Sequence, residues 1–197
     1  LSLPQYTSDI VDVGIQQGGI ERATPEIMRK ETYENLTLFM TEDEIQSVEP
    51  YYTENSEGNY ELNTKDVQVL DVMDQALGMP MLILESLQES EEYDFGQMRQ
   101  AFESGMITKD QMLNMRDEAE ASFGTMSDSI IQQKANLFVK EEYKALGMDL
   151  DAIQMDYLKY KGVQMLGMAV IMTAASILVS LLAAKTAAGI GRTLRQN

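Results

Sequence analysis

The feature that most restricts how this chain can fold is an uncharged apolar stretch near its C-terminal end. Residues 162–184 read GVQMLGMAVIMTAASILVSLLAA and contain no Asp, Glu, Lys or Arg. As an α-helix this stretch would be about 34 Å long, enough to cross the roughly 30 Å hydrocarbon core of a bilayer. A buried helix of a soluble protein is the alternative, but soluble cores seldom need so long a run without a charged edge. The sequence therefore predicts a transmembrane helix over Gly162–Ala184.

Charge is distributed unevenly on the two sides of Gly162. All 32 acidic residues precede it, so the formal charge is −20 for residues 1–161 and +3 for the rest. Nucleic acid and anionic headgroups require positive charge opposite them, so we expect no nucleic-acid partner. The chain contains no Cys and no His, which excludes disulfides and removes the usual ligands of zinc. A solvated acidic domain beside a membrane is the simplest interpretation.

Helix start signals divide residues 20–160 into short helices, with no convincing alternating strand. Thr24-Pro25-Glu26 predicts the start of a helix that runs to about Met40. Further starts are predicted at Thr41, Asp94, Thr108, Ser127 or Asp128, and Asp149.

Stop signals complete this prediction. Gly78 and Pro80 predict the end of one helix before another over Met81–Gln88, and the polar stretch Tyr51–Asn63 is predicted to be a loop. The expected fold is all-α: a compact bundle of short helices joined to a long transmembrane helix.

Three stretches resemble parts of the type IV ABC exporters, whose membrane domain has six helices in each half. LSLPQYTSDIVDVGIQQGGI (residues 1–20) resembles the outer end of their first membrane helix. AAKTAAGIGRTLRQN (183–197) is similar to the stretch where the second membrane helix enters the cytoplasm and leads to the first coupling helix. FVKEEYKALGMDLDAIQMDYL (138–158) looks like the approach to the second helix in members with an enlarged first extracellular loop.

The resemblance implies three parts. Residues 1–20 would end membrane helix 1, residues 21–148 would form an extracytoplasmic helical domain, and residues 149–197 would form helix 2, with its span at 162–184 and a cytoplasmic extension at 185–197. The whole would belong to a multi-pass protein of a bacterial cell membrane. Three basic residues after the span against Lys159 and Lys161 before it give a weak positive-inside signal for this orientation. A start at Leu1 without a signal-peptide pattern leads us to expect a fragment.

The functional expectation is part of the permease of an ATP-driven exporter, with helix 2 linking the substrate cavity to the nucleotide-binding domains. The sequence lacks G-x-x-x-x-G-K-[ST], so this fragment is expected to be no enzyme and to hold no cofactor or metal. The acid cluster Glu42-Asp43-Glu44 lacks the spacing of a calcium loop. The resemblance implies ATP and Mg²⁺ in the full-length protein, which would hydrolyse ATP.

The expected partners follow from the same resemblance. They are the remaining membrane helices and nucleotide-binding domain of the same transporter, a second half-transporter in a homodimer or heterodimer, and the lipid bilayer. The alternative function is an acidic helical interaction domain outside the cytoplasm, tethered by one C-terminal membrane anchor and performing no transport.

Small residues recur at intervals of three and four along the predicted span, which places them on one helix face: Ala169, Thr173, Ser176, Ser180 and Ala184. Small side chains let helix backbones approach closely, and hydroxyls can bond across the contact. The stripe therefore predicts packing against other membrane helices. The alternative is a lipid-facing helix whose small residues are incidental.

Met165, Met168 and Met172 form a neighbouring stripe, and flexible Met side chains suit a surface that accommodates varied apolar substrates. They are candidates for a substrate pathway, although Met also fills ordinary helix contacts. Gln164 is a further candidate that is equally compatible with snorkelling or with pairing to another helix.

The residues after the span are candidates for coupling to the nucleotide-binding domain, as the resemblance implies: Lys185, Gly189, Gly191, Arg192 and Arg195. The two glycines would allow bending or close packing, or are simply tolerated in a helix held by its neighbours.

Overall fold

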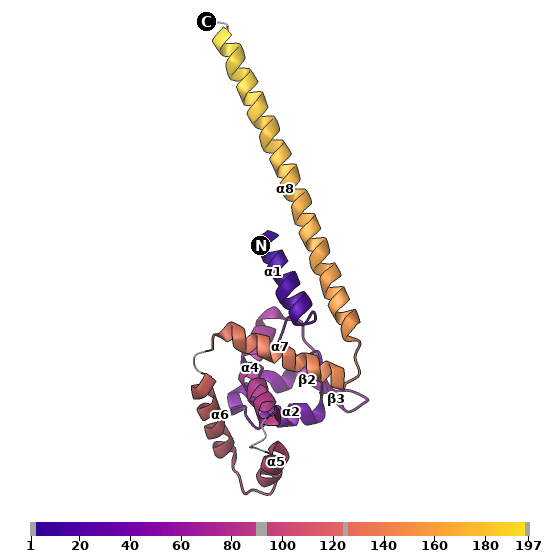
Figure 1. Cartoon of the computed structure of the whole chain (residues 1–197), viewed down its shortest axis with the longest axis vertical. Helices are drawn as coiled ribbons and strands as arrows, with labels where there is room; N and C mark the ends of the chain where they lie inside the picture. The colour runs from indigo at the N-terminus through magenta and orange to yellow at the C-terminus, as the bar shows by residue number, and fades with distance from the viewer. Residues whose placement is uncertain (1–2, 90–93, 124–125, 196–197) are drawn as a thin grey trace. The chain divides into compact units, whose positions relative to one another are not determined.

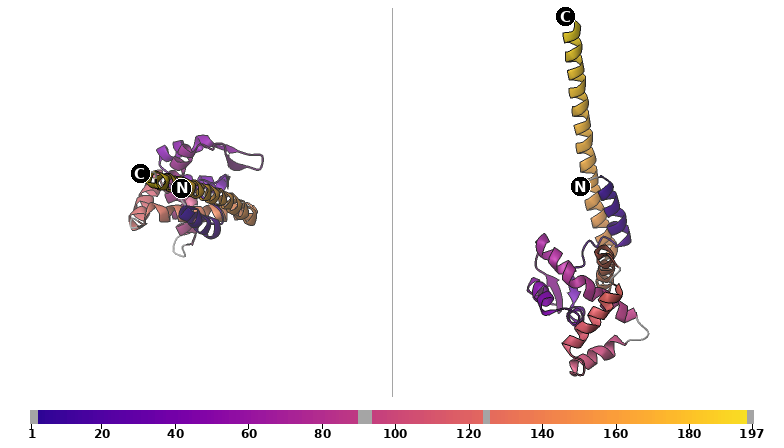
Figure 2. Two further views of the ribbon diagram at one scale, coloured as in Figure 1. Left: turned by 90° about the horizontal axis from the view of Figure 1, so that it is seen from above. Right: turned by 90° about the vertical axis from the view of Figure 1, so that its left-hand side faces the viewer.

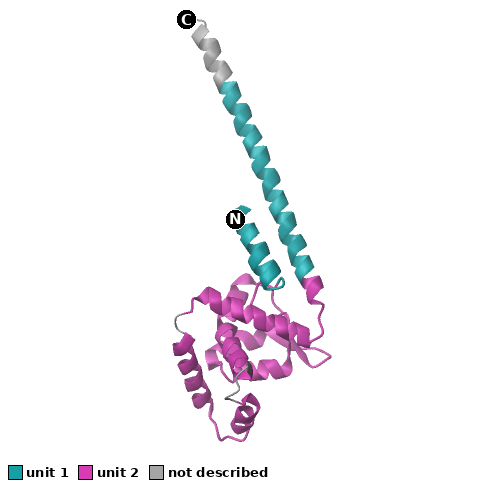
Figure 3. Cartoon of the chain, viewed as in Figure 1, with its two compact units in different colours: residues 1–19, 154–197 teal, residues 20–153 magenta. Residues whose placement is uncertain are grey.

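The chain divides into two compact units, as Figure 3 shows. The computed structural model describes residues 3–89, 94–123 and 126–195, with side chains described for 3–88, 94–123 and 126–186. One unit comprises residues 20–153, and the other comprises residues 1–19 and 154–197. In the described ranges the fold is all-α with a small sheet, and it consists of a compact helical bundle joined to a long helix (Figure 1).

The unit of residues 20–153 contains six helices that lie wholly within its described part: α2 (Lys30–Thr37), α3 (Glu42–Val48), α4 (Val67–Glu89), α5 (Phe95–Glu103), α6 (Lys109–Phe123) and α7 (Asp128–Ala145). A short 3-10 helix, η2 (Glu49–Tyr51), follows α3. Three strands complete the unit: β1 (Ile27–Arg29), β2 (Tyr52–Glu54) and β3 (Asn59–Leu62).

The predicted loop over Tyr51–Asn63 is wrong, because this stretch forms a β-hairpin (Figure 1). The sheet is antiparallel in the order β1-β3-β2, with Met28 opposite Tyr60 and Thr53 opposite Glu61. The strands have only three or four residues, too few to establish a clear alternating pattern in the sequence. Pairing across the sheet defines them instead.

The predicted helix start at Thr24 is also wrong. The N–H and the hydroxyl of Thr24 both donate to Asp74 Oδ1, over 2.8 and 2.7 Å, so this side chain binds α4 instead of capping a helix. The residues that follow pair as β1, and α2 begins only at Lys30. A contact fifty residues away in sequence has displaced the local capping preference.

Helix α4 continues through Gly78 and Pro80, where the sequence predicted a break. Proline removes one backbone hydrogen bond from a helix interior and normally kinks or ends it. Here the surrounding packing outweighs that cost, since Leu77, Met81 and Leu84 are almost completely buried in the core. Gly78 lies close to α7, where an added Cβ would meet Ile131 Cγ2 at 3.4 Å.

Several predicted helix ends are confirmed. Thr41 and Glu44 form a reciprocal capping box at the start of α3, and Asp94 accepts from two N–H groups at the start of α5. Gly105 and Gly147 follow α5 and α7 with φ of 76° and 73°, the left-handed conformation in which glycine commonly terminates helices.

Glu44 also receives Arg116 from α6, which makes the capping box part of a tertiary contact. Burial alone would raise the pKa of Glu44, but hydrogen bonds from Arg116 and Thr41 outweigh burial and hold this pKa below its usual value. The cap and the ion pair therefore favour the same charged form of Glu44.

The second unit contains α1 (Leu3–Asp9), a π-helical segment η1 (Ile10–Gln16) and most of α8 (Leu150–Arg195). The predicted start is confirmed by Asp149, whose Oδ1 accepts from Ala152 N over 3.0 Å. As predicted, α8 then runs without a break into the apolar stretch. Figure 2 shows α8 as one uninterrupted helix with α1 beside it.

Candidate functional site

Helix α8 exposes a long apolar surface that the described part of the chain leaves uncovered. Its stretch Leu150–Thr186 is long and apolar enough to cross a membrane, and none of the 18 residues in its most apolar part is buried. Leu166 and Val179, for example, are 67% and 66% exposed. An uncovered apolar surface of this length requires an apolar environment or partner.

A second helix, α4, is also long and apolar enough to cross a membrane, but it is partly buried. In Val67–Gln88, 56% of the most apolar 18-residue stretch is buried inside the protein. They form the centre of the helical core, with Met73 and Leu77 inaccessible to solvent. The apolar surface of α4 is therefore explained by folding, and the surface of α8 is not.

The hydroxyls of the predicted packing stripe donate within α8 itself. Thr173, Ser176 and Ser180 bond to the carbonyls of Ala169, Met172 and Ser176, over 2.8, 2.9 and 2.9 Å. Such bonds satisfy a hydroxyl donor in surroundings without water. The stripe is exposed from Thr173 to Ala184, while Ala169 is partly covered; no described residue packs over its exposed portion as a neighbouring helix would.

The candidate pathway residues lie on α8 with graded exposure. Gln164, Met165 and Met168 are half-buried, whereas Met172 is 51% exposed. None of the four lines either of the cavities described for this structure. Their role in a substrate pathway stays a prediction.

The candidate coupling residues lie in the last part of α8. The backbone is helical as far as Arg195, and Lys185 is exposed. The side-chain surroundings of Gly189, Gly191, Arg192 and Arg195 lie outside the described residues, so the predicted coupling role stays untested there.

Sequence reasoning did not identify the residues that join α1 and η1 to α8. Gln154 Nε2 donates to the carbonyl of Gly14 over 2.7 Å, and an added Cβ at Gly14 would come within 2.6 Å of Leu158 Cδ2. Lys161 Nζ lies 3.3 Å from Asp9 Oδ2 and 5.3 Å from the centre of the Tyr157 ring. Asp9 and Lys161 have opposite charges but lie 152 positions apart, so no local pattern in the sequence indicates their pairing.

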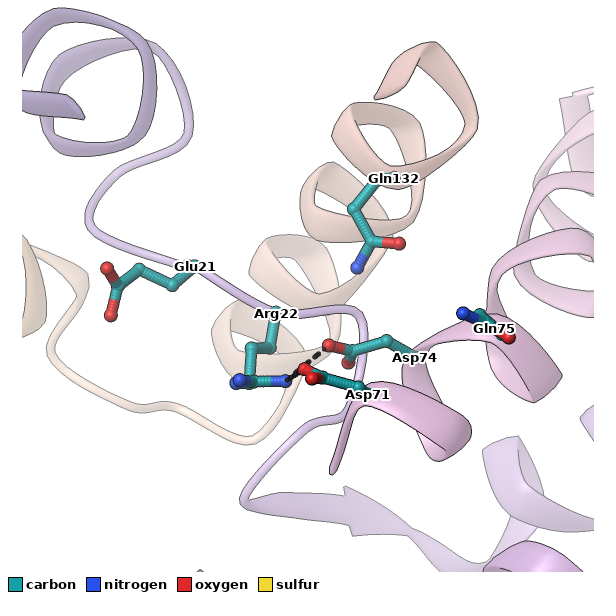
Figure 4. Close-up of a pocket in the computed structure, with 6 residues that line it drawn as sticks. All are labelled: Glu21, Arg22, Asp71, Asp74, Gln75 and Gln132. Carbon is teal, nitrogen blue, oxygen red and sulfur yellow. Dashed lines mark hydrogen bonds and ion pairs between the residues drawn. The ribbon is translucent and has the colours of Figure 1, made fainter. Parts of the chain in front are cut away.

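A polar cavity of about 520 Å³ lies in the helical domain (Figure 4). Arg22 Nη1 lies between Asp71 Oδ1 and Asp74 Oδ2, at 2.9 and 2.8 Å, while Glu21 and Gln132 line the same space. Burial alone would lower the pKa of Arg22, but hydrogen bonds and charge interactions with Asp71 and Asp74 raise it above its usual value. The arrangement ties residues 22–24 to α4.

In the part of the chain that the structure describes, no three Asp or Glu side chains are grouped closely enough to hold a metal ion. The exposed apolar surface of α8 is the observation on which a functional assignment can be built.

Comparison with known proteins found no relative of this chain. No protein-family model, curated protein or solved structure matches this chain.

Proposed function

We propose that α8 crosses a lipid bilayer over residues 162–184 and that the chain is part of the permease of an ATP-driven ABC exporter. The observation that carries the membrane assignment is the uncovered apolar surface of α8. At about 25 cal/mol per Å², leaving such a surface in water would be strongly unfavourable, so lipid or other apolar helices must cover it.

The exporter assignment draws its support from the resemblance of residues 1–20, 138–158 and 183–197 to the first two membrane helices of that family. Under this proposal, α8 is helix 2 and residues 1–20 end helix 1. The contacts of Gly14 with Tyr157 and Leu158 would then hold the outer ends of these two helices together. Residues 21–148 would lie outside the cytoplasm, and residues 185–197 inside it.

The proposed mechanical role uses the continuity of α8. A helix without an internal break transmits a displacement along its axis, because each turn is hydrogen-bonded to the next. Movement of the cytoplasmic extension, including Lys185 and Arg192, would therefore reach the level of the membrane. ATP and Mg²⁺ would bind to the nucleotide-binding domain of the full-length transporter, and a second half-transporter would complete the substrate pathway.

Cysteine labelling tests the proposed orientation. The chain has no native Cys, so Ser129→Cys in the acidic domain and Gln196→Cys after the span each introduce a single reporter within it. We expect a membrane-impermeant maleimide to label Ser129→Cys on intact spheroplasts and Gln196→Cys only after permeabilisation. The reverse pattern would contradict the orientation, and equal labelling of both positions without permeabilisation would contradict the membrane crossing.

A separate experiment tests the exporter assignment. We expect the reading frame that encodes this chain to contain four further apolar spans and a phosphate-binding G-x-x-x-x-G-K-[ST] loop downstream, and its purified product in nanodiscs to hydrolyse ATP. A stop codon soon after the codon for Asn197 would favour the tethered interaction domain and exclude the exporter.

A further inference from the structure

Helix α1 runs antiparallel to α8 and lies beside the start of its apolar stretch (Figures 1 and 2). Gly14 of η1 lies against Leu158 of α8. Asp9, earlier in the chain than Gly14, pairs with Lys161, later in the chain than Leu158, at 3.3 Å. The residues of α1 before Asp9 therefore lie beside the residues of α8 after Lys161, at the level of the proposed membrane span.

Helix α8 is covered on one side only at this level. From 170 to 186 each described side chain of α8 is exposed, as expected of a helix without a neighbour. Before position 170, Gln164, Met165 and Met168 are half-buried, which requires a covering element, and α1 is the helix of the same unit that lies there. Val163 and Leu166 remain 70% and 67% exposed, so they lie on the side of α8 that faces away from α1.

The side of α1 that faces away from α8 is polar. Tyr6 is buried, whereas Pro4, Gln5, Thr7 and Ser8 are exposed. Successive residues of an α-helix are turned by about 100°, which centres these four exposed residues on the side opposite to Tyr6. None of the four is a large apolar residue.

The polar side continues from α1 along η1. Ser8 Oγ donates to Asp12 Oδ2 over 2.7 Å, and Gln16 Nε2 donates to Asp12 Oδ1 over 3.4 Å. The side chain of Asp9 keeps 37% of its surface exposed despite its ion pair. Because exposed carboxylates are costly in hydrocarbon, this end of the strip requires water. A polar strip therefore leads from Gln16 and Asp12, beyond the apolar stretch, to Gln5 beside that stretch.

We propose that the polar side of α1 faces water within the outer half of the bilayer, while the side of α8 that carries Val163 and Leu166 faces lipid at the same depth. Exposed polar side chains at membrane depth almost always face a water-filled space or the protein interior. The hydroxyls of Thr7 and Ser8 already donate within α1 and η1, so a packed neighbouring helix would gain little from them. Water is the better match for this surface.

The inference rests on the proposed membrane crossing of α8 and not on the exporter assignment. It adds that α1 and α8 together form a boundary between lipid and a water-filled space that is open to the outside. Water, or a small solute that forms hydrogen bonds, is the partner that this surface fits.

Cysteine labelling at matched depths tests the proposal, because the chain has no native Cys. Both helices rise about 1.5 Å per residue, so Ser8 lies near the depth of Val163 and Gln5 near that of Leu166. Each position is changed to Cys, and membrane fragments open on both sides are treated with a membrane-impermeant maleimide. We expect the two α1 thiols to react at least about tenfold faster than the two α8 thiols, because a thiol in hydrocarbon stays protonated. Equal labelling of all four variants after denaturation in detergent is the control.

A fifth variant, Val179→Cys within the span, separates this proposal from the membrane crossing itself. Rapid labelling of Val179→Cys would overturn the crossing. If Val179→Cys is protected and all four other thiols react rapidly, both helices stand above the bilayer, and only the present inference fails. Protection of Ser8→Cys and Gln5→Cys would show that lipid or protein covers α1 and would also overturn it.

Nitroxide spin labels on the same thiols give a second measurement that does not depend on thiol reactivity. Oxygen is concentrated in hydrocarbon, whereas a neutral nickel chelate stays in water. In the purified protein in nanodiscs, we expect the label at Ser8→Cys to collide mainly with the nickel chelate and the label at Leu166→Cys mainly with oxygen. The same preference at both positions would overturn the proposal.

Discussion

Glu142 shows how one buried charge joins distant parts of the helical domain. Its carboxylate is 3% exposed and accepts from the backbone N–H of Arg29 over 2.7 Å and from the hydroxyl of Thr32 over 2.9 Å. The guanidinium of Arg29 adds an ion pair at 2.7 Å. Helix α7 is thereby attached to β1 and α2, through residues that precede Glu142 by 113 and 110 positions.

Loss of the Glu142 charge should destabilise the domain. Glu142→Gln replaces one acceptor oxygen with an NH₂ donor and removes the charge, so a donor on Arg29 or Thr32 loses its acceptor. We expect the free energy of unfolding to fall by about 2–4 kcal/mol. Urea denaturation monitored by tyrosine fluorescence measures this change.

The neighbouring Glu141 provides the control. It is 65% exposed and forms a surface ion pair with Lys144 at 3.1 Å, so Glu141→Gln should change the free energy of unfolding by no more than about 0.5 kcal/mol. Similar effects of the two substitutions would show that the buried network contributes little.

At the scale of elements, a glycine of η1 lies at the contact of α1 and η1 with α8. An added Cβ at Gly14 would come within 2.6 Å of Leu158 Cδ2 and 3.4 Å of the Tyr157 ring, so a larger side chain requires Leu158 to move, and the Gly14 carbonyl accepts from Gln154 over 2.7 Å. The absence of a side chain at Gly14 leaves room for the side chains of Tyr157 and Leu158 on α8.

A larger residue at this contact should separate the helices. Gly14→Val would place atoms inside the space of Leu158, and overpacking of this kind costs about 1–3 kcal/mol. Hydrogen–deuterium exchange of the amides of residues 3–16, measured in nanodiscs, should accelerate by about tenfold or more.

Gly162→Val is the matched control on α8, because an added Cβ at Gly162 meets no atom within 4 Å. Exchange in residues 3–16 should then stay at the parent rate. If Gly14→Val also left exchange unchanged, close packing at Gly14 would not be what holds these helices together.

At the scale of the whole molecule, the two units differ in what surrounds their apolar residues. Residues 20–153 bury a continuous core of their own, with Phe39, Leu36 and Met81 inaccessible to solvent. In the other unit, the apolar residues of α8 from 170 to 186 are exposed. One unit is stabilised mainly by its own packing, and the other requires an apolar environment.

This difference predicts that residues 20–153 fold alone. Expressed without the rest of the chain, they should be soluble without detergent and should unfold in one cooperative thermal transition, whereas the full chain should need lipid or detergent. Circular dichroism in the near and far ultraviolet measures both the transition and the specific packing. A far-ultraviolet helical signal with no near-ultraviolet signal and strong binding of a hydrophobic dye would contradict the prediction.

Features that depend on neighbouring residues could be predicted from the sequence. The capping box at Thr41, the cap at Asp94 and the helix ends before Gly105 and Gly147 were predictable because each involves side chains or backbone within a few positions. The long apolar helix was predictable for a similar reason, since its length and lack of charge are properties of one continuous stretch.

Features that depend on distant partners follow from tertiary packing and have no local sequence signal. Thr24 bonds to Asp74 instead of capping a helix, the hairpin strands exist through cross-strand pairing, and α4 continues through Pro80 because its neighbours bury it. The approach of Gly14 to Leu158 likewise arises from segments far apart in the chain. The helix-breaking cost of Gly or Pro is about 1–3 kcal/mol. Tertiary contacts can contribute free energies of similar size, so packing can outweigh a local preference.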